Sequence, residues 1–335
     1  MKGTTVQLAL PMFPKCADTF KLSEQKEFGV EPEATCDVKE VCCRTLPGWL
    51  EIVANTGSGG YRFRTTTNVV KMPCLPSFIC AIDGDQGHRP YMEAVKDRTW
   101  AVKFQRAIAG DLNNTGRLKH WRHRQGIPEG KRLVLHQESD DADLERFHKK
   151  TLHPNFFSIL RASPNTICVS PGYSVYDDGS MCRHQQLLNM KRSFDFFILA
   201  SDNGVPCIPC LGWNLREDLS RIAQWINAHP KLCYVAINAQ TLRRDQFTKL
   251  CRDMTDVERD SRPLRWVVFG GRRVVEHLNG CGFNKRLTLI TAMPIQRARA
   301  GRAIDTTFHS DNKIELFLYN HATMQARCTG RMMGA

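Results

Sequence analysis

The expected fold is decided by one stretch, Ile167-Cys168-Val169-Ser170-Pro171-Gly172-Tyr173-Ser174-Val175-Tyr176-Asp177-Asp178-Gly179-Ser180. A short β-branched run ends at a Pro-Gly pair, and a loop with two tyrosines and two adjacent carboxylates follows. Beyond the loop, apolar residues between Leu187 and Ile198 recur with a helical spacing. A buried strand that leads through a polar loop into a helix is the repeating unit of an α/β protein.

The same unit recurs along the chain. From residue 73 onward we expect strands at 77–82, 132–135, 166–170, 205–211, 232–237, 264–269 and 287–291, with an eighth candidate at 315–319. Two prolines make the 205–211 strand irregular, and helices are expected at 91–109 and after an N-cap box of Asn214 and Glu217. About eight strand–helix units predict a (β/α)8-like barrel, and an open doubly wound parallel sheet is the alternative.

Two regions are expected to stand apart from the barrel. Residues 1–72 are rich in turn formers and contain a glycine-rich turn at 55–60, which predicts an irregular or β extension at the N-terminus. The barrel-like domain then spans 73–335, with a basic insertion around 110–132.

The composition bounds the class of protein. A net charge of +13 in 335 residues favours a polyanionic partner, and residues 261–335 alone hold twelve Lys/Arg against four Asp/Glu. No stretch approaches the length of a membrane span, and the N-terminal run does not have the pattern of a signal peptide. We therefore expect a cytoplasmic protein without a membrane partner, in which most of the fourteen cysteines are reduced core residues.

A cluster of basic and aromatic residues predicts contact with nucleic acid. Arginine and histidine side chains alternate with one tryptophan, which suits phosphate contact and base stacking. The candidate nucleic-acid-binding residues are Arg117, Lys119, Trp121, Arg122 and Arg124. A solvated basic connection between two elements explains the same residues equally well.

Polar residues at the ends of the expected strands supply the candidate active site, because the active sites of (β/α)8 barrels lie at the carboxyl ends of the strands. The candidate catalytic residues are Asp178, Asp83, Asp177 and Glu138, and the candidate substrate-binding residues are Tyr173, Trp213, Asn214 and Asn238. Glycines followed by arginines at the start of a helix are typical of phosphate sites, which selects Gly270, Gly271, Arg272 and Arg273, with Arg297 beyond them.

The sequence contains no strong motif for a cofactor or a metal. His136-Gln137-Glu138 with Cys207 and Cys210 has the residue types of a zinc nucleobase deaminase. The two cysteines, however, are expected along a strand, whereas that zinc motif places them at the start of a helix. Zinc is therefore kept only as a minor alternative.

Two resemblances bear on the setting. Residues 171–177, residues 202–209 with Trp213, and residues 267–270 resemble an uncharacterised barrel-like family carried by phages and mobile elements; the similarity covers roughly 165–295. The strand-end loop with Asp178-Gly179-Ser180 resembles the tRNA-guanine transglycosylase superfamily, including its DNA-modifying members. That resemblance implies that an aspartate attacks the anomeric carbon of a nucleoside. The sequence departs from the superfamily in lacking its three-Cys-plus-His zinc site.

The sequence thus favours a nucleic-acid- or nucleotide-acting enzyme, a transglycosylase-like transferase or a glycosidase, with Asp178 as nucleophile and Asp83 as acid/base. Two alternatives remain open. One is a non-catalytic nucleic-acid-binding protein of a phage or mobile element. The other is a barrel enzyme in which Gly270–Arg273 holds a phosphorylated small molecule.

Overall fold

The computed structural model describes residues 63–82, 86–104, 121–124, 126–128, 130–137, 141–151, 155–163, 165–173, 175, 183–305 and 307–329. The four candidate catalytic carboxylates, Asp83, Glu138, Asp177 and Asp178, lie outside these residues, as do Arg117 and Lys119. Most of the predicted N-terminal region also lies outside them, so the domain boundary at residue 72 stays a prediction.

The centre of the fold is a parallel sheet that closes on itself. Its strand order is β5-β4-β3-β2-β1-β9-β8-β7-β6, and every pairing is parallel. The strands are β1 (Phe78–Ile82), β2 (Thr99–Lys103), β3 (Arg132–His136), β4 (Thr166–Val169), β5 (Cys207–Ile208), β6 (Cys210–Leu211), β7 (Tyr234–Asn238), β8 (Arg265–Phe269) and β9 (Leu287–Thr291). Because β5 and β6 are two halves of one chain segment, the nine strands fill eight barrel positions. The predicted (β/α)8-like barrel is confirmed.

The seam between β5 and β6 is set by Pro209, which has no N–H to donate to the ladder. The carbonyl of Pro209 accepts the Ala236 N–H at 2.8 Å, which ties the segment to β7. On the other side, the Ser170 hydroxyl accepts the Cys210 N–H at 2.7 Å and lies 2.9 Å from the Ser193 hydroxyl, which donates to the Cys210 carbonyl. Side-chain hydrogen bonds therefore complete the ladder where the proline interrupts it, and the predicted irregular strand is confirmed.

Alternation along the strands separates two cores. Residues such as Ala101, Val134, Ile167, Ala236 and Val267 fill the inside of the barrel, and their strand neighbours face the helices. The near-continuous burial of β1, β4 and β9 follows from this two-sided packing.

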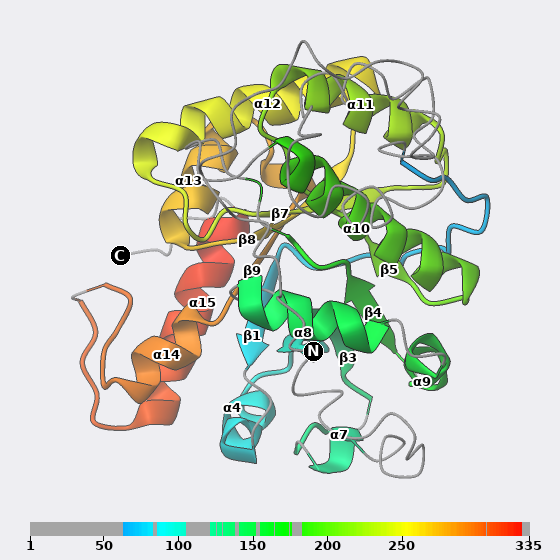
Figure 1. Ribbon diagram of the computed structural model, residues 1–335. Helices are drawn as coiled ribbons and strands as arrows, with labels where there is room; N and C mark the ends of the chain where they lie inside the picture. The colour runs from blue at the N-terminus through cyan, green and yellow to red at the C-terminus, as the bar shows by residue number, and fades with distance from the viewer. Residues whose placement is uncertain are drawn as a thin grey trace, which may run out of the picture.

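The helices surround the strands (Figure 1). They are α4 (Arg89–Ala94), α7 (Trp121–Arg124), α8 (Asp141–Thr151), α9 (Phe156–Ala162), α10 (Arg183–Asp202), α11 (Arg216–Asn227), α12 (Phe247–Asp260), α13 (Arg272–Gly280), α14 (Met293–Arg299) and α15 (Lys313–Thr329), with 3-10 turns η2 (Gln86–His88), η3 (Arg244–Gln246) and η4 (Asn284–Arg286). Within the described residues, no helix combines the length and the apolar character needed to cross a bilayer.

Three expectations about individual elements were wrong. The predicted helix at 91–109 contains only the short helix α4 and is then interrupted by β2, whose residues Trp100 and Val102 are fully buried against the helices. The candidate strand at 315–319 is part of α15. The N-cap of α11 uses neither Asn214 nor Glu217 as the acceptor, because the Asp218 carboxylate accepts the N–H groups of Asn214 and Leu215.

Candidate functional site

A small cavity lies at the carboxyl ends of the strands, which form the mouth of the barrel and are where barrel enzymes carry their active sites. It has a volume of about 140 Å³. The strands β1, β2, β3, β8 and β9 contribute its wall, and two glutamines complete it: Gln240 from the loop after β7 and Gln296 from α14. Its lining residues are Ala81, Ile82, Lys103, His136, Gln240, Phe269, Ile290, Thr291, Ala292 and Gln296.

His136 is the most unusual residue of this cavity. Its side chain is 4% exposed, and its ring lies 5.1 Å from the ring of Phe269, measured between centroids. Neither ring nitrogen has a hydrogen-bond partner among the described residues. Burial, with a smaller effect of the Lys103 charge, lowers the pKa of His136 to about 3. The imidazole is therefore neutral at physiological pH and offers one donor and one acceptor to whatever enters the cavity.

Lys103 lies beside this histidine. The two residues are register partners in the β2–β3 pair, so their side chains leave the same face of the sheet. Lys103 is partly exposed, and both residues line the cavity. A cation next to a neutral imidazole suits an anionic or carbonyl-bearing ligand, because negative charge on the ligand would be stabilised there.

A wider basin adjoins this cavity over the loops that follow β8 and β9. Two further cavities of about 510 and 420 Å³ form this basin. The first shares Gln240, Thr291, Ala292 and Gln296 with the small cavity, and the two large cavities share Gln240, Gly271, Met293 and Arg297. The three cavities are therefore neighbours that share walls, between His136 and the basin over the loops.

The start of α13 forms one side of this basin. Gly271 is its N-cap residue, and the N–H groups of the next turn have no carbonyl of their own helix to bind. A Cβ on Gly271 would lie 3.3 Å from Met293 Cε, so a side chain there would crowd the basin wall. The backbone is therefore open to a ligand at the point where a helix attracts anions.

Four arginines line the same basin. Arg273, Arg297 and Arg302 are exposed, whereas the Nε of Arg272 lies 3.0 Å from a carboxylate oxygen of Glu276. The structure therefore places all five candidate phosphate-binding residues, Gly270, Gly271, Arg272, Arg273 and Arg297, around two adjoining cavities. Phosphate binding by them remains a prediction.

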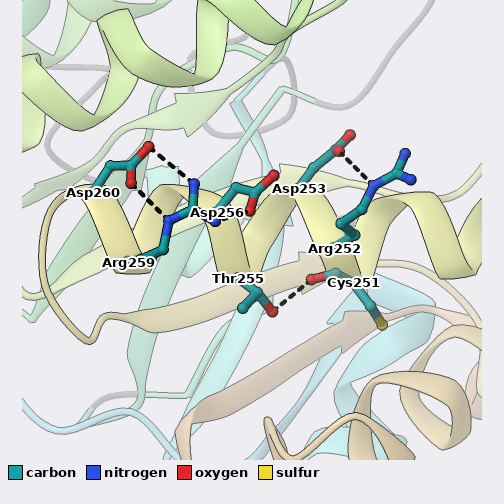
Figure 2. A network of polar contacts seen from close by, with 7 residues as sticks. All are labelled: Cys251, Arg252, Asp253, Thr255, Asp256, Arg259 and Asp260. Carbon is teal, nitrogen blue, oxygen red and sulfur yellow. Dashed lines mark hydrogen bonds and ion pairs between the residues drawn. The ribbon is translucent and has the colours of Figure 1, made fainter.

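The candidate substrate-binding residues are not gathered in this space. Trp213 and Asn214 line a separate cavity of about 270 Å³ between α11 and α12. The Trp213 indole donates to Asp253 at 2.9 Å, and the Asn214 amide donates to Gln186 at 3.1 Å. Figure 2 shows Asp253 on α12 with Asp256 and Asp260. These contacts give Trp213 and Asn214 a role in positioning helices.

The other two candidates differ from each other. Tyr173 is 7% exposed, with its ring 6.2 Å from that of His148 and 5.7 Å from the guanidinium of Arg192. It lines none of the cavities described above. Asn238 is the exposed last residue of β7, and its side chain accepts the N–H of Gln240, which does line the mouth. Of the four candidates, Asn238 is the one that contacts a residue lining the small cavity.

The described part of the basic cluster does not have the predicted form. Trp121 is 3% exposed, and its indole donates to the Ser163 hydroxyl, so it is not placed to stack on bases. The Arg122 guanidinium donates to the Lys131 carbonyl and the Thr166 hydroxyl, at the amino ends of β3 and β4. Both residues therefore lie at the end of the barrel opposite the mouth. Arg124 belongs to the same short helix, α7.

The deaminase-like zinc set is not assembled either. Cys207 faces the outer core between strands and helices, whereas Cys210 faces the inside of the barrel. Two cysteines on opposite faces of one segment cannot bind one ion with His136.

Two charged residues of the site, Lys103 and Arg302, were not among the sequence candidates. Lys103 was placed inside an expected helix, although the alternation in Thr99–Lys103 is a strand signal. Arg302 follows α14, beyond the last residue that the Gly-Arg motif suggested. Nothing in the sequence around Arg302 distinguishes it from the other arginines in this basic part of the chain.

Comparisons with known proteins add the following. No family model matches the sequence, and no curated protein matches it. One solved structure similar to this chain is that of D-psicose 3-epimerase in the presence of D-fructose. The TM-score is 0.38 at 11% identity, and the alignment covers 76% of this chain and 99% of that chain. The barrel itself is established by the order and pairing of the strands.

Proposed function

We propose that this protein is a barrel enzyme that acts on a phosphorylated small molecule at the carboxyl end of the barrel. One observation carries the proposal: a cavity lined by a buried histidine, which has no hydrogen-bond partner among the described residues, adjoins a basin lined by arginines and a helix N-terminus. The basin would hold the phosphate, and the small cavity would hold the part of the substrate that reacts.

The charged groups at the two ends of the site have different proposed roles. Arg273, Arg297 and Arg302 would neutralise a phosphate, and the first N–H groups of α13 would orient it. His136, whose lowered pKa makes it a weak base, would donate a hydrogen bond to a substrate oxygen while it stays neutral. Lys103 would stabilise negative charge that develops on that oxygen.

The residue that moves a proton is proposed from chain position. Asp83 follows Ile82, a residue of the cavity wall, and Glu138 follows His136 by two positions. We keep Asp83 as the proposed acid/base. If the substrate is a nucleotide, Asp178 is the proposed nucleophile at the glycosidic carbon.

The proposal is tested by thermal unfolding with matched ligand pairs. Sugar phosphates and nucleoside monophosphates should raise the melting temperature, whereas the same compounds without phosphate should not. Arg297→Ala should reduce the shift at a fixed ligand concentration. Arg161→Ala removes an exposed arginine from α9, away from the mouth, and should leave the shift unchanged.

Two results would count against this assignment. Equal shifts with and without the phosphate group would show that the basin does not recognise it. Tight binding of DNA or RNA that weakens steeply with salt and survives Arg297→Ala would favour a nucleic-acid surface elsewhere. If the first screen instead finds a phosphorylated substrate, as proposed, Lys103→Met and His136→Leu should each lower its turnover.

A further inference from the structure

Three metal-ligating side chains meet on the outside of the barrel, between α12 and α13. Cys251 belongs to α12, His277 to the last turn of α13, and Cys281 to the position that caps α13. Their ligand atoms all lie within 4.8 Å of one another. Cys251 is buried, His277 is half-buried and Cys281 is exposed, so the group spans from the core to the surface.

The helices direct these side chains toward one another. His277 and Cys281 are four positions apart at the end of one helix, which places them on the same face. The Cys281 N–H donates to the His277 carbonyl at 3.1 Å and fixes this turn. Figure 2 shows the sulfur of Cys251 on the other side of α12 from the carboxylate of Asp253. The thiol is therefore separated from the charged face of its helix.

The histidine has unused binding capacity. Its Nε2 atom is buried and has no hydrogen-bond partner among the described residues. The ring packs beside Phe247 with the centroids 5.7 Å apart. A buried imidazole nitrogen without a partner destabilises the fold, and an ion bound to the imidazole would offset that cost.

We propose that Cys251, His277 and Cys281 bind one Zn²⁺ ion that links α12 to α13. Two thiolates and an imidazole are a ligand set that zinc prefers, and the group contains no carboxylate of the kind that magnesium or calcium would need. A tetrahedral zinc site has ligand atoms roughly 3.5–3.8 Å apart, so a contraction of about 1 Å is sufficient. Water completes the fourth position.

The ion would have a structural consequence for the mouth of the barrel. Helix α13 carries the two ligands at its end and the phosphate basin at its start. Holding the end of α13 against α12 would reduce the motion of the whole short helix. The metal site does not depend on the proposed function, because zinc would bind there whatever the substrate is.

The experiment measures metal in the full-length protein after reduction, removal of metal and reloading. Wild-type protein should bind one more equivalent of Zn²⁺ than Cys281→Ser or His277→Asn, measured by mass spectrometry of the metal. With Co²⁺ it should show a thiolate charge-transfer band and the visible bands of tetrahedral cobalt. Cys233→Ser removes an exposed cysteine outside the cluster and should bind as much metal as wild type.

Cys281 is exposed, so Cys281→Ser should fold and keep the comparison valid even if a change at buried Cys251 does not. Zinc should also raise the melting temperature of wild type and of Cys233→Ser, but not that of Cys281→Ser. Equal metal content in wild type and Cys281→Ser would overturn the proposal. So would a Cys251–Cys281 disulfide together with the absence of a cobalt band after reduction.

Discussion

At the scale of single residues, His136 stands out because its position costs stability. A buried imidazole with two unpaired nitrogens loses hydrogen bonds to water and gains none among the described residues. The ring is held against Phe269 on the inside of the barrel, where an aliphatic side chain would pack without that cost. Such a conflict between burial and chemistry is typical of functional sites.

The lowered pKa of His136 predicts how stability depends on pH. Above pH 6.5 the imidazole is neutral in both the folded and unfolded chains and contributes nothing to the pH dependence. Between pH 6.5 and about 3 the unfolded chain takes up a proton that the folded chain does not, so the free energy of unfolding falls as the pH falls. The loss should be on the order of a few kcal/mol.

Urea unfolding of wild type and His136→Leu across this range measures the effect. The variant should lose this part of the pH dependence and should be as stable as wild type, or about 1 kcal/mol more stable, at pH 7. His309→Gln removes an exposed histidine and controls for the loss of one histidine. A variant much less stable than wild type at pH 7 would show that His136 has a structural partner.

How far single residues could be predicted depends on burial. The Gly270–Arg273 motif could be placed at a mouth because a strand pattern ends there and a helix begins. The position of the Trp121 side chain could not be predicted, because a tryptophan among arginines has the same sequence pattern whether its ring is packed in the core or exposed. Only the packing of α7 against the Ser163 region decides between the two.

At the scale of elements, the interrupted strand shows how the barrel tolerates a proline. The 205–211 segment could be predicted as irregular from its two prolines, but the hydrogen bonds that replace the missing ladder bond could not be predicted. The hydrogen bonds that complete it come from Ser170 and Ser193, on β4's end and on α10. Such partners are distant in sequence, and no local pattern indicates them.

This seam predicts a specific cost for Ser170→Ala. The substitution removes the acceptor of the Cys210 N–H at a fully buried position, so the free energy of unfolding should fall by about 1–3 kcal/mol. Ser220→Ala changes an exposed serine of α11 and should shift it by less than about 0.5 kcal/mol. Denaturant unfolding of the three proteins measures both values. Equal stability of Ser170→Ala and wild type would mean that the seam does not need this hydroxyl.

The two wrongly assigned elements, the helix at 91–109 and the strand at 315–319, have a common physical cause. In both, the segment was assigned without the tertiary contacts that decide its structure. Residues 315–319 contain an apolar run that ends in an aromatic residue, which fits a strand, but burial at Leu316, Asn320, Thr323 and Cys328 follows a helical spacing over the longer window. Conversely, Trp100 and Val102 fit both an amphipathic helix and a two-sided strand, and pairing with β1 and β3 selects the strand.

At the scale of the whole molecule, the expected number of eight strands was right although one member was wrong. The structure replaces the candidate at 315–319 with β2, so the ring still closes between β9 and β1. The outer face near this closure is covered by α15, which contacts α4, α13, α14 and β1 (Figure 1). Helix α15 thus packs against elements from both the first and the last part of the barrel.

Phe317 is the centre of that contact and gives the test of it. It is fully buried, with its ring 5.2 Å from that of Tyr91 and 6.4 Å from that of Trp100. Phe317→Ala should lower the free energy of unfolding by about 3–5 kcal/mol, because the helix would lose a large side chain and leave a cavity over the closure.

Leu318 is the matched control for this helix, since it is the next residue and is 38% exposed. Leu318→Ala should change the free energy of unfolding by less than about 0.5 kcal/mol, because little apolar surface is lost there. Guanidinium unfolding of both variants, followed by tryptophan fluorescence, separates the two positions. If Phe317→Ala melts only α15 and leaves the barrel folded, the helix is an accessory to a barrel that closes by strand pairing alone. If the whole transition shifts, closure and helix docking form one cooperative unit.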